Sequence, residues 1–308
     1  MHSIEAKDAQ FALAAHRFLM RLPRSAISAF LWIIVYLYFF ESTQSVETSL
    51  IRTVLLYALS QTITMLCAPL ALRLIRGNML RGMVFGTLIS AAALTYAGAL
   101  ASGIFPHGAA AVGILLGLYR AFYRAPYLLE HREVAPEQRS FLTIELVLAS
   151  APLFAGLAVG SMVFYPHLLI AAAVIHMLAL VPLLYVPHVY EDYSWSYRRA
   201  FKELLDAKNH SLLSHSFFMG VAGGVLFLIW PLLLYFLFAP SPLALGAAFS
   251  GTLFLILAFR FSRARVVIDQ HADDATYIDE YTVLKEMALA GGRLAVALAA
   301  VALVAMTL

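Results

Sequence analysis

Nine apolar stretches, each about as long as a helix that crosses a bilayer, dominate this chain. A hydrocarbon core about 30 Å thick needs about 20 residues of helix, and helices are expected because an open strand leaves peptide groups unpaired in hydrocarbon. The expected segments are 23–40, 50–72, 83–102, 108–127, 141–162, 168–186, 212–238, 242–259 and 288–308. The predicted fold class is therefore an all-α polytopic helical membrane protein with about nine transmembrane helices.

The composition also favours a membrane protein. Hydrophobic residues make up 62% of the 308 residues and charged residues 13%, which exceeds the apolar share of a soluble domain. The single cysteine, Cys67, excludes an internal disulfide framework and a multi-cysteine zinc site. No small-residue cleavage pattern follows segment 23–40, so we expect an uncleaved first span rather than a signal peptide.

Lysine and arginine residues are concentrated in segments expected on one side of the membrane. If the N-terminus is cytoplasmic, the N-terminal tail and the inner loops hold all of the 21 basic residues except Arg52. This follows the positive-inside rule and predicts an inner-membrane protein with a cytoplasmic N-terminus and an external C-terminus. The net charge of +3 is then a consequence of topology, so the bilayer is the expected partner and nucleic acid is not.

Arg120 and Arg124 lie near the predicted end of segment 108–127, among aromatic and aliphatic residues. Both fall within two turns of the predicted inner boundary, where a long arginine stem reaches interfacial water. Tyr119 and Tyr123 belong to a series spaced by four residues, which suits the aromatic belt of a membrane interface. One interpretation is therefore an interfacial edge without a functional role.

A second interpretation gives the two arginines a gating role. Glu145 in the fifth segment lies about 9 Å of helix rise beyond Arg139, so its depth is expected to match that of Arg120 and Arg124. A carboxylate in lipid is costly and normally faces the bundle interior or a partner. The three residues are candidates for a gating ion pair that opens and closes with helix movement, or for a static strut.

Other polar and aromatic residues fall on helix faces. In the second segment, Tyr57 and Gln61 share one side of the helix, and the first segment has two large side chains spaced by four. His176 stands alone in the middle of the sixth segment, either as a hydrogen-bonded packing residue or as a proton carrier. The candidates for a substrate pathway are Trp32, Tyr36, Tyr57, Gln61, Tyr119, Tyr123 and His176.

Small residues and a proline mark the fifth segment. Glycines at 156 and 160 are spaced for close approach between helices, and the upstream proline loosens the local hydrogen-bond ladder. The stretch is either a tight packing site or a bendable helix at a moving interface. The predicted helix-packing motif comprises Ala151, Pro152, Ala155, Gly156 and Gly160.

The motifs around spans two to five resemble the major facilitator superfamily of secondary transporters. APLFAG, residues 151–156, is similar to the glycine-proline motif of that family in span five, with Ala151 and Ala155 in place of glycines. RLIRGNMLRGM, residues 73–83, lies where the family has its motif between spans two and three, but the usual acidic residue is missing. The charged segment EDYSWSYRRAFKELLDAKNH looks like the family's central cytoplasmic linker.

The resemblance implies two parallel repeats. LWIIVYLYFF from Leu31 and IWPLLLYFLF from Ile229 both place a tryptophan second, at an offset of 198 residues. The second half is short, with three spans. The expected organisation is one six-helix half at 1–188, a cytoplasmic linker at 189–210 and a truncated C-terminal half at 211–308.

The predicted function is a secondary transporter that moves a small solute through a cavity lined by spans one, two, four and five. Midplane binding between rocking repeats is what the resemblance implies, and Glu145 and His176 permit proton coupling. The alternative is a degenerate, non-transporting scaffold or regulatory subunit, whose incomplete half would bind a protein partner.

No catalytic motif is recognisable. The sequence has no nucleophile elbow, phosphate loop or HExxH motif, so we expect neither an enzyme nor a cofactor. His271, Asp273 and Asp274 are more typical of a solvated acidic loop than of a cation site, so no metal is expected.

Overall fold

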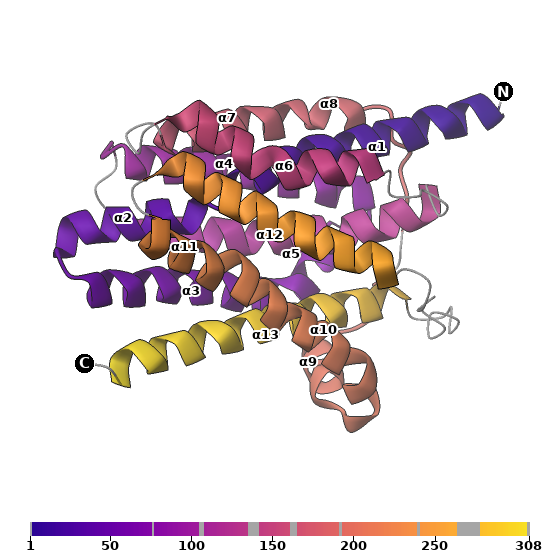
Figure 1. Cartoon of the computed structure of the whole chain (residues 1–308). Helices are drawn as coiled ribbons and strands as arrows, with labels where there is room; N and C mark the ends of the chain where they lie inside the picture. The colour runs from indigo at the N-terminus through magenta and orange to yellow at the C-terminus, as the bar shows by residue number, and fades with distance from the viewer. Residues whose placement is uncertain are drawn as a thin grey trace.

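The computed structural model describes residues 2–75, 77–104, 108–134, 142–160, 165–190, 193–238, 241–263 and 278–306. Within these ranges the regular structure is helical, apart from an isolated bridge between Asn78 and Tyr190. The acidic loop with His271, Asp273 and Asp274 lies outside the described residues. The helices run back and forth in one bundle, with the N-terminus at one end and the C-terminus towards the other (Figure 1).

Each predicted segment corresponds to one crossing of the bundle. The helices are α1 (His2–Ile27), α2 (Leu31–Thr43), α3 (Val46–Leu74), α4 (Met79–Ala101), α5 (Ala109–Val134), α6 (Leu142–Val159), α7 (Tyr165–Leu178), α8 (Leu180–Leu183), α9 (Tyr197–Leu205), η2 (Ala207–Asn209), α10 (His210–Gly224), the π-helical turn η3 (Val225–Ile229), α11 (Trp230–Phe238), α12 (Pro242–Arg263) and α13 (Ile278–Met306). We call the end of the bundle that carries α9 the linker end, and the other the opposite end.

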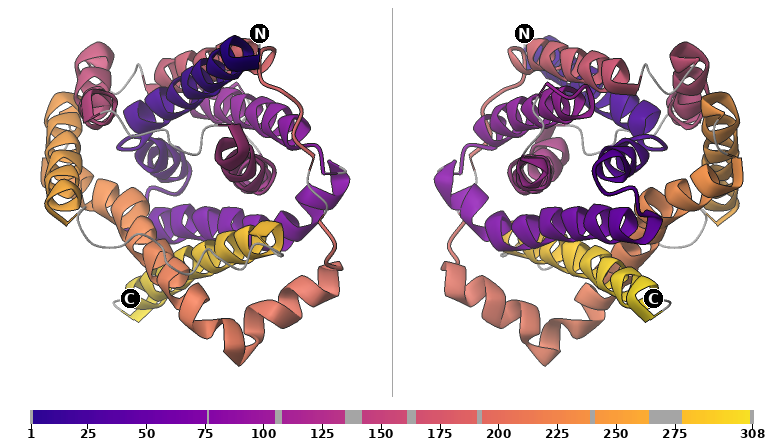
Figure 2. Two further views of the ribbon diagram at one scale, coloured as in Figure 1. Left: turned by 90° about the vertical axis from the view of Figure 1, so that its right-hand side faces the viewer. Right: turned by 90° about the vertical axis from the view of Figure 1, so that its left-hand side faces the viewer.

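The chain is an all-α polytopic membrane protein, as predicted. In the described part, seven helical stretches are long and apolar enough to cross a membrane, and α1 and α2, bent by 43°, form an eighth. The remaining predicted segment, 108–127, belongs to α5, whose two arginines lower its hydropathy. Because α5 packs between α3 and α4, its polar groups face other helices, and Figure 2 shows it inside a ring of helices.

Several helices are longer than their predicted segments, and in α1 and α5 the difference changes where arginines lie. Helix α1 begins at His2, so Arg21 and Arg24 lie on a helix of the bundle and not in a tail. Helix α5 continues to Val134 and places Arg120 about 21 Å from its linker end. Arg120 therefore lies further from this end than segment 108–127 predicts, because α5 continues past the last residue of that apolar run.

Close backbone approaches join the N-terminal helices to α10–α13. A Cβ atom at Gly156 of α6 would lie 2.5 Å from the carbonyl oxygen of Pro242 in α12. Reciprocally, a Cβ atom at Gly246 of α12 would lie 2.3 Å from the carbonyl oxygen of Pro152 in α6. Helices α3 and α13 form the second extensive contact between the two groups of helices. The absence of side chains at the two glycines allows α6 and α12 to touch.

The segment between α8 and α10 is docked on the bundle. Helix α9 contacts α3 and α13, and Trp195 and Ala200 are buried in a cluster with Leu72 and Leu284. The backbone N–H of Met79 donates to the Val189 carbonyl at 3.1 Å, which ties the segment to the start of α4. The predicted linker therefore covers the linker end of α3 and α13.

Candidate functional site

The structure buries all seven residues predicted to line a substrate pathway. The indole of Trp32 packs edge-on against the ring of Tyr57, with centroids 5.1 Å apart, so α2 and α3 meet at this point. The buried residues, from Gln61 and His176 with no exposed surface to Tyr123 with 7%, are Trp32, Tyr36, Tyr57, Gln61, Tyr119, Tyr123 and His176. Their side chains contact other helices and not lipid.

Five charged residues from three helices form what we call the arginine cluster. They are Arg24 of α1, Arg120 and Arg124 of α5, and Glu286 and Arg293 of α13. The Glu286 carboxylate lies within electrostatic range of all four guanidinium groups. The cluster has a formal net charge of +3, which a single carboxylate does not balance.

The arginine cluster lies near the middle of the bundle. Arg120 is the twelfth of the 26 residues of α5, and Arg293 is the sixteenth of the 29 residues of α13. Their partner helix α3 contributes Ser60 and Gln61 from its own middle. A cationic group at this depth is costly in a membrane protein and usually marks a functional site.

Arg120 contacts α3 through neutral groups. Its Nη1 donates to the Ser60 hydroxyl at 3.0 Å, and the same hydroxyl accepts from Gln61 Nε2 at 2.9 Å. Ser60 in turn donates to the Tyr57 carbonyl at 2.7 Å, so its hydrogen-bonding capacity is used. The Gln61 Oε1 atom is buried and has no hydrogen-bond partner among the described residues.

Arg24 reaches Tyr119 from the other side of α5. Its Nη1 donates to the Tyr119 hydroxyl at 2.5 Å, and its guanidinium lies over the phenol ring, 5.1 Å from the centroid. Arg24 nevertheless remains exposed, as does 41% of the Arg124 side chain. The arginine cluster is therefore not fully enclosed by protein.

The predicted gating pair between the α5 arginines and Glu145 needs correction. Glu145 forms a bidentate ion pair with Arg21 of α1, at 2.7 and 2.8 Å. Arg124 Nε pairs with Glu286 Oε1 of α13 at 2.7 Å, while Arg120 meets Ser60. The reason is packing, because α6 lies against α1 and α12, whereas α5 lies against α3, α4 and α13.

His176 is held by hydrogen bonds at both ring nitrogens. Its Nε2–H donates to the Met20 carbonyl at 3.2 Å, because a carbonyl can only accept, and its Nδ1 accepts from the Ser90 hydroxyl at 3.0 Å. Similarly, His16 donates from Nδ1 to the Ala179 carbonyl and accepts at Nε2 from the Tyr123 hydroxyl. This pattern fits a neutral imidazole that joins α7 to α1 and α4 better than a proton carrier.

Tyr36 lies where the first and seventh crossings meet. Its ring packs against Tyr235 and Phe236 of α11, with centroids 5.8 and 5.5 Å apart. The two tryptophans of the predicted repeat both anchor their segments, Trp32 against Tyr57 and Trp230 through a 2.9 Å hydrogen bond to the Thr252 hydroxyl. Helices α2 and α11 are therefore in contact.

The predicted packing motif of α6 is only partly used for packing. Ala151 and Ala155 are buried, and Gly156 and Pro152 contact α12 as described above. Gly160 does not belong to this interface. It follows the end of α6 with a positive φ of 59°, and a Cβ atom there would have no neighbour within 4 Å. Gly160 therefore ends the helix and does not pack against another one.

The missing N–H of Pro152 is compensated by α1. Because proline has no amide hydrogen, the Leu148 carbonyl lacks its usual helical donor. The Ser25 hydroxyl donates to this carbonyl at 2.5 Å. On the other side, the Leu153 N–H donates to the Ser250 hydroxyl of α12 at 3.0 Å. The proline therefore links α6 to both neighbouring helices.

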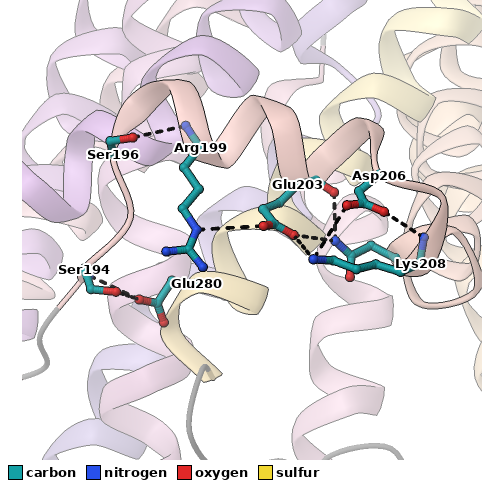
Figure 3. Close-up of polar contacts among 8 residues, drawn as sticks. Ser194, Ser196, Arg199, Glu203, Asp206, Lys208 and Glu280 are labelled. Carbon is teal, nitrogen blue, oxygen red and sulfur yellow. Dashed lines mark hydrogen bonds and ion pairs between the residues drawn. The ribbon is translucent and has the colours of Figure 1, made fainter.

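The docked linker carries a second polar group, which Figure 3 shows beside the start of α13. Glu280 accepts from the backbone N–H and the hydroxyl of Ser194, at 3.1 and 2.7 Å. Glu203 pairs with Lys208 at 2.9 Å, and this hydrogen bond lowers the pKa of the Glu203 carboxyl below its usual range. These contacts hold the segment in place outside the membrane-spanning helices.

Among the described residues, no group of three or more histidine, cysteine, aspartate or glutamate side chains could hold a metal ion. No protein-family model matches the chain, and no curated protein is significantly similar to it. The interpretation of the site therefore depends on the geometry given above.

Sequence reasoning missed four members of the polar interior. Arg21 and Glu286 precede the predicted segments 23–40 and 288–308, and Arg24 and Arg293 lie within them near their starts, but none of the four is among the predicted site residues. Glu286 and Arg293 are spaced by seven residues and so share one face of α13. That spacing is the signal in the sequence that could have found them.

Proposed function

We propose that the chain is a secondary transporter of the major facilitator type, which moves a small solute by alternating access. The observation that carries this proposal is the arginine cluster at the middle of α5 and α13, which lies among apolar helices and keeps part of its surface exposed. Charged residues at membrane depth are characteristic of substrate and ion pathways. A static scaffold has no need for three excess positive charges in its interior.

The breaks in two crossings also support the proposal. The first crossing is interrupted between Ile27 and Leu31, and the seventh forms a π-helical turn at Val225–Ile229. These positions differ by the same 198 residues that separate Trp32 from Trp230. Discontinuous helices in corresponding places are typical of substrate sites between transporter repeats, and π-bulges are frequent at functional sites.

The contacts between the two groups of helices are suited to rocking. They meet along α6 and α12 and along α3 and α13, and the arginine cluster adjoins the α3–α13 contact through Arg120 and Glu286. The α6–α12 contact is made by glycine and proline backbones, so few side chains must repack when the helices tilt. This arrangement supports alternating access around a fixed site.

Uptake into proteoliposomes would test the function, combined with distances at the two ends of the bundle. Cys67 is the only cysteine, so a Cys67→Ser background accepts engineered spin-label pairs. Exposed positions are Arg81 with Ser211 at the linker end, and Ile104 with Leu237 at the opposite end. A transported solute should shorten the distance between the spin labels at one end of the bundle and lengthen the distance at the other end.

The alternative is a degenerate scaffold or regulatory subunit. It predicts no solute uptake from a metabolite panel and no reciprocal distance change. It also predicts that a protein partner copurifies with the intact membrane protein. Uptake together with reciprocal motion would exclude it.

We further propose that the linker end faces the cytoplasm of a cell with an inner membrane, which leaves the C-terminus outside. The distribution of basic residues supports this orientation. Labelling of a cysteine introduced at Arg198, which is exposed on α9, would test it. Reaction with an impermeant maleimide from the external side of intact cells would contradict the orientation.

A further inference from the structure

The guanidinium groups of the arginine cluster have far more hydrogen-bond donors than acceptors. Each guanidinium has five N–H groups. Among the described residues, Arg293 forms no hydrogen bond or close ion pair, and its guanidinium lies beside Gly223 of α10, where a Cβ atom would be 3.4 Å from Nε. Arg120 donates once, to a serine hydroxyl, and Arg24 donates once, to a tyrosine hydroxyl.

Neutral hydroxyl partners do not balance the charge. Arg120 lies within electrostatic range of both Arg293 and Arg24, and each of these pairs is repulsive. Of the four arginines in the cluster, only Arg124 forms an ion pair with a carboxylate of the described residues, that of Glu286. Cations brought together away from bulk water are unfavourable unless an anion joins them. The group that would complete the cluster is therefore negatively charged.

We propose that the arginine cluster binds the carboxylate or phosphate group of a small anionic solute, which deepens the proposed transport function and rests on it. A guanidinium presents parallel N–H donors that match the two oxygens of these anions. Arg120 and Arg293 provide the free donors from α5 and α13, and exposed Arg24 provides the approach from α1. Because α5 and α13 belong to different groups of helices, one anion would link the two groups.

Thermal unfolding of the purified full chain would test anion binding without requiring transport. The probes are inorganic phosphate, citrate and glucose 6-phosphate, with glucose and choline as neutral and cationic controls, at millimolar concentration and constant ionic strength. A ligand that binds only the folded state raises the apparent melting temperature in a saturable way. We expect this response to at least one anion and to neither control.

Two variants and a matched control test whether stabilisation by anions depends on the arginine cluster. Phosphate stabilises many folded proteins by exclusion from their surface, so the difference between wild type and variant is the measurement. Arg120→Gln and Arg293→Gln should each raise the apparent Kd about tenfold to a hundredfold, whereas Arg52→Gln, an exposed arginine of α3, should not change it. If a glutamine variant does not fold, Arg120→Lys and Arg293→Lys keep the charge. They should still weaken binding, because lysine lacks the two parallel N–H donors of the guanidinium.

The outcomes separate this inference from the proposed function. Saturable anion binding that depends on Arg120 and Arg293, with no uptake into proteoliposomes, would support the anion site and reject transport. Uptake of a neutral or cationic solute that is unchanged in Arg293→Gln would support transport and reject the anion site. No saturable response to any anion would also reject it.

A phospholipid headgroup offers the same phosphate chemistry, so a short-chain phosphatidylglycerol is included as a further probe in the thermal-unfolding experiment. Stabilisation by this lipid alone, with none by phosphate, citrate or glucose 6-phosphate, would assign the cluster to a lipid and overturn binding of a soluble solute. Stabilisation by a soluble anion in protein that has been freed of lipid is the result we expect.

Discussion

Arg124 in α5 and Glu286 in α13 form an ion pair, with 2.7 Å between Nε and Oε1. The pair joins a helix enclosed by N-terminal helices to the last helix described. Only 5% of the Glu286 side chain is exposed, against 41% for Arg124. Glu286 therefore depends on protein partners for compensation, whereas Arg124 keeps part of its side chain free of protein contacts.

Substitutions of the two partners of this pair should lower the free energy of unfolding by different amounts. Glu286→Gln removes the single carboxylate that lies among four guanidinium groups, so we expect it to lower the free energy of unfolding by about 2 kcal/mol. Arg124→Gln leaves Glu286 within range of the other three arginines, and Arg124 is itself partly exposed, so its effect should be smaller. Denaturant unfolding in detergent measures both values. A larger loss in Arg124→Gln than in Glu286→Gln would contradict this account.

The α6–α12 interface predicts which glycines tolerate a methyl group. Gly156→Ala and Gly246→Ala should each cost about 1–3 kcal/mol, because the added Cβ meets the backbone of the opposite helix. Gly251→Ala is the matched control in α12, since a Cβ there has no neighbour within 4 Å. Thermal stability should be unchanged or slightly higher in the control, because alanine is the better helix former. Equal effects at Gly246 and Gly251 would show that the close contact does not form.

The stabilising effect of the Ser25 hydroxyl should depend on the proline at residue 152. Ser25→Ala leaves the Leu148 carbonyl without a donor and should cost about 1–3 kcal/mol. Pro152→Ala restores an amide hydrogen that can bond the same carbonyl, so Ser25→Ala should cost less in that background. A double-mutant cycle measured by unfolding gives the coupling. Ser150→Ala is the control, because this exposed serine bonds only within its own helix.

The crossings were predictable from the sequence because bilayer thickness sets a minimum length for each apolar run. The start of α1 was not, because residues 2–22 mix charged and apolar positions and contain no long apolar run. The arrangement of helices was equally hidden. Arg21 finds Glu145 at a separation of 124 residues, and apolar periodicity does not specify which helices become neighbours.

Only part of the candidate site could be predicted, because the sequence shows the faces of single helices but not which helices pack together. Tyr57 and Gln61 were identified by spacing along one helix, which is a local property. The association of Arg120 with Arg293 depends on how α5 and α13 pack, which is a property of the whole bundle. The spacing of Glu286 and Arg293 marks a polar face on α13, but only the packing shows that this face meets α5.

The linker should loosen in acid because of Glu203. The hydrogen bond from Lys208 holds the pKa of this carboxyl below its unfolded value, and a group of this kind contributes stability that is present above the unfolded pKa. That contribution is lost as the pH falls through the lower, folded pKa. Protection of the amides of α9 and η2, which is the exchange rate relative to the intrinsic rate at each pH, should therefore decrease below about pH 4.5. Glu203→Gln, which does not titrate, should exchange faster than wild type at neutral pH and gain little more in acid. A wild-type chain whose linker protection is the same at neutral and acidic pH would show that the Glu203–Lys208 contact does not hold the segment.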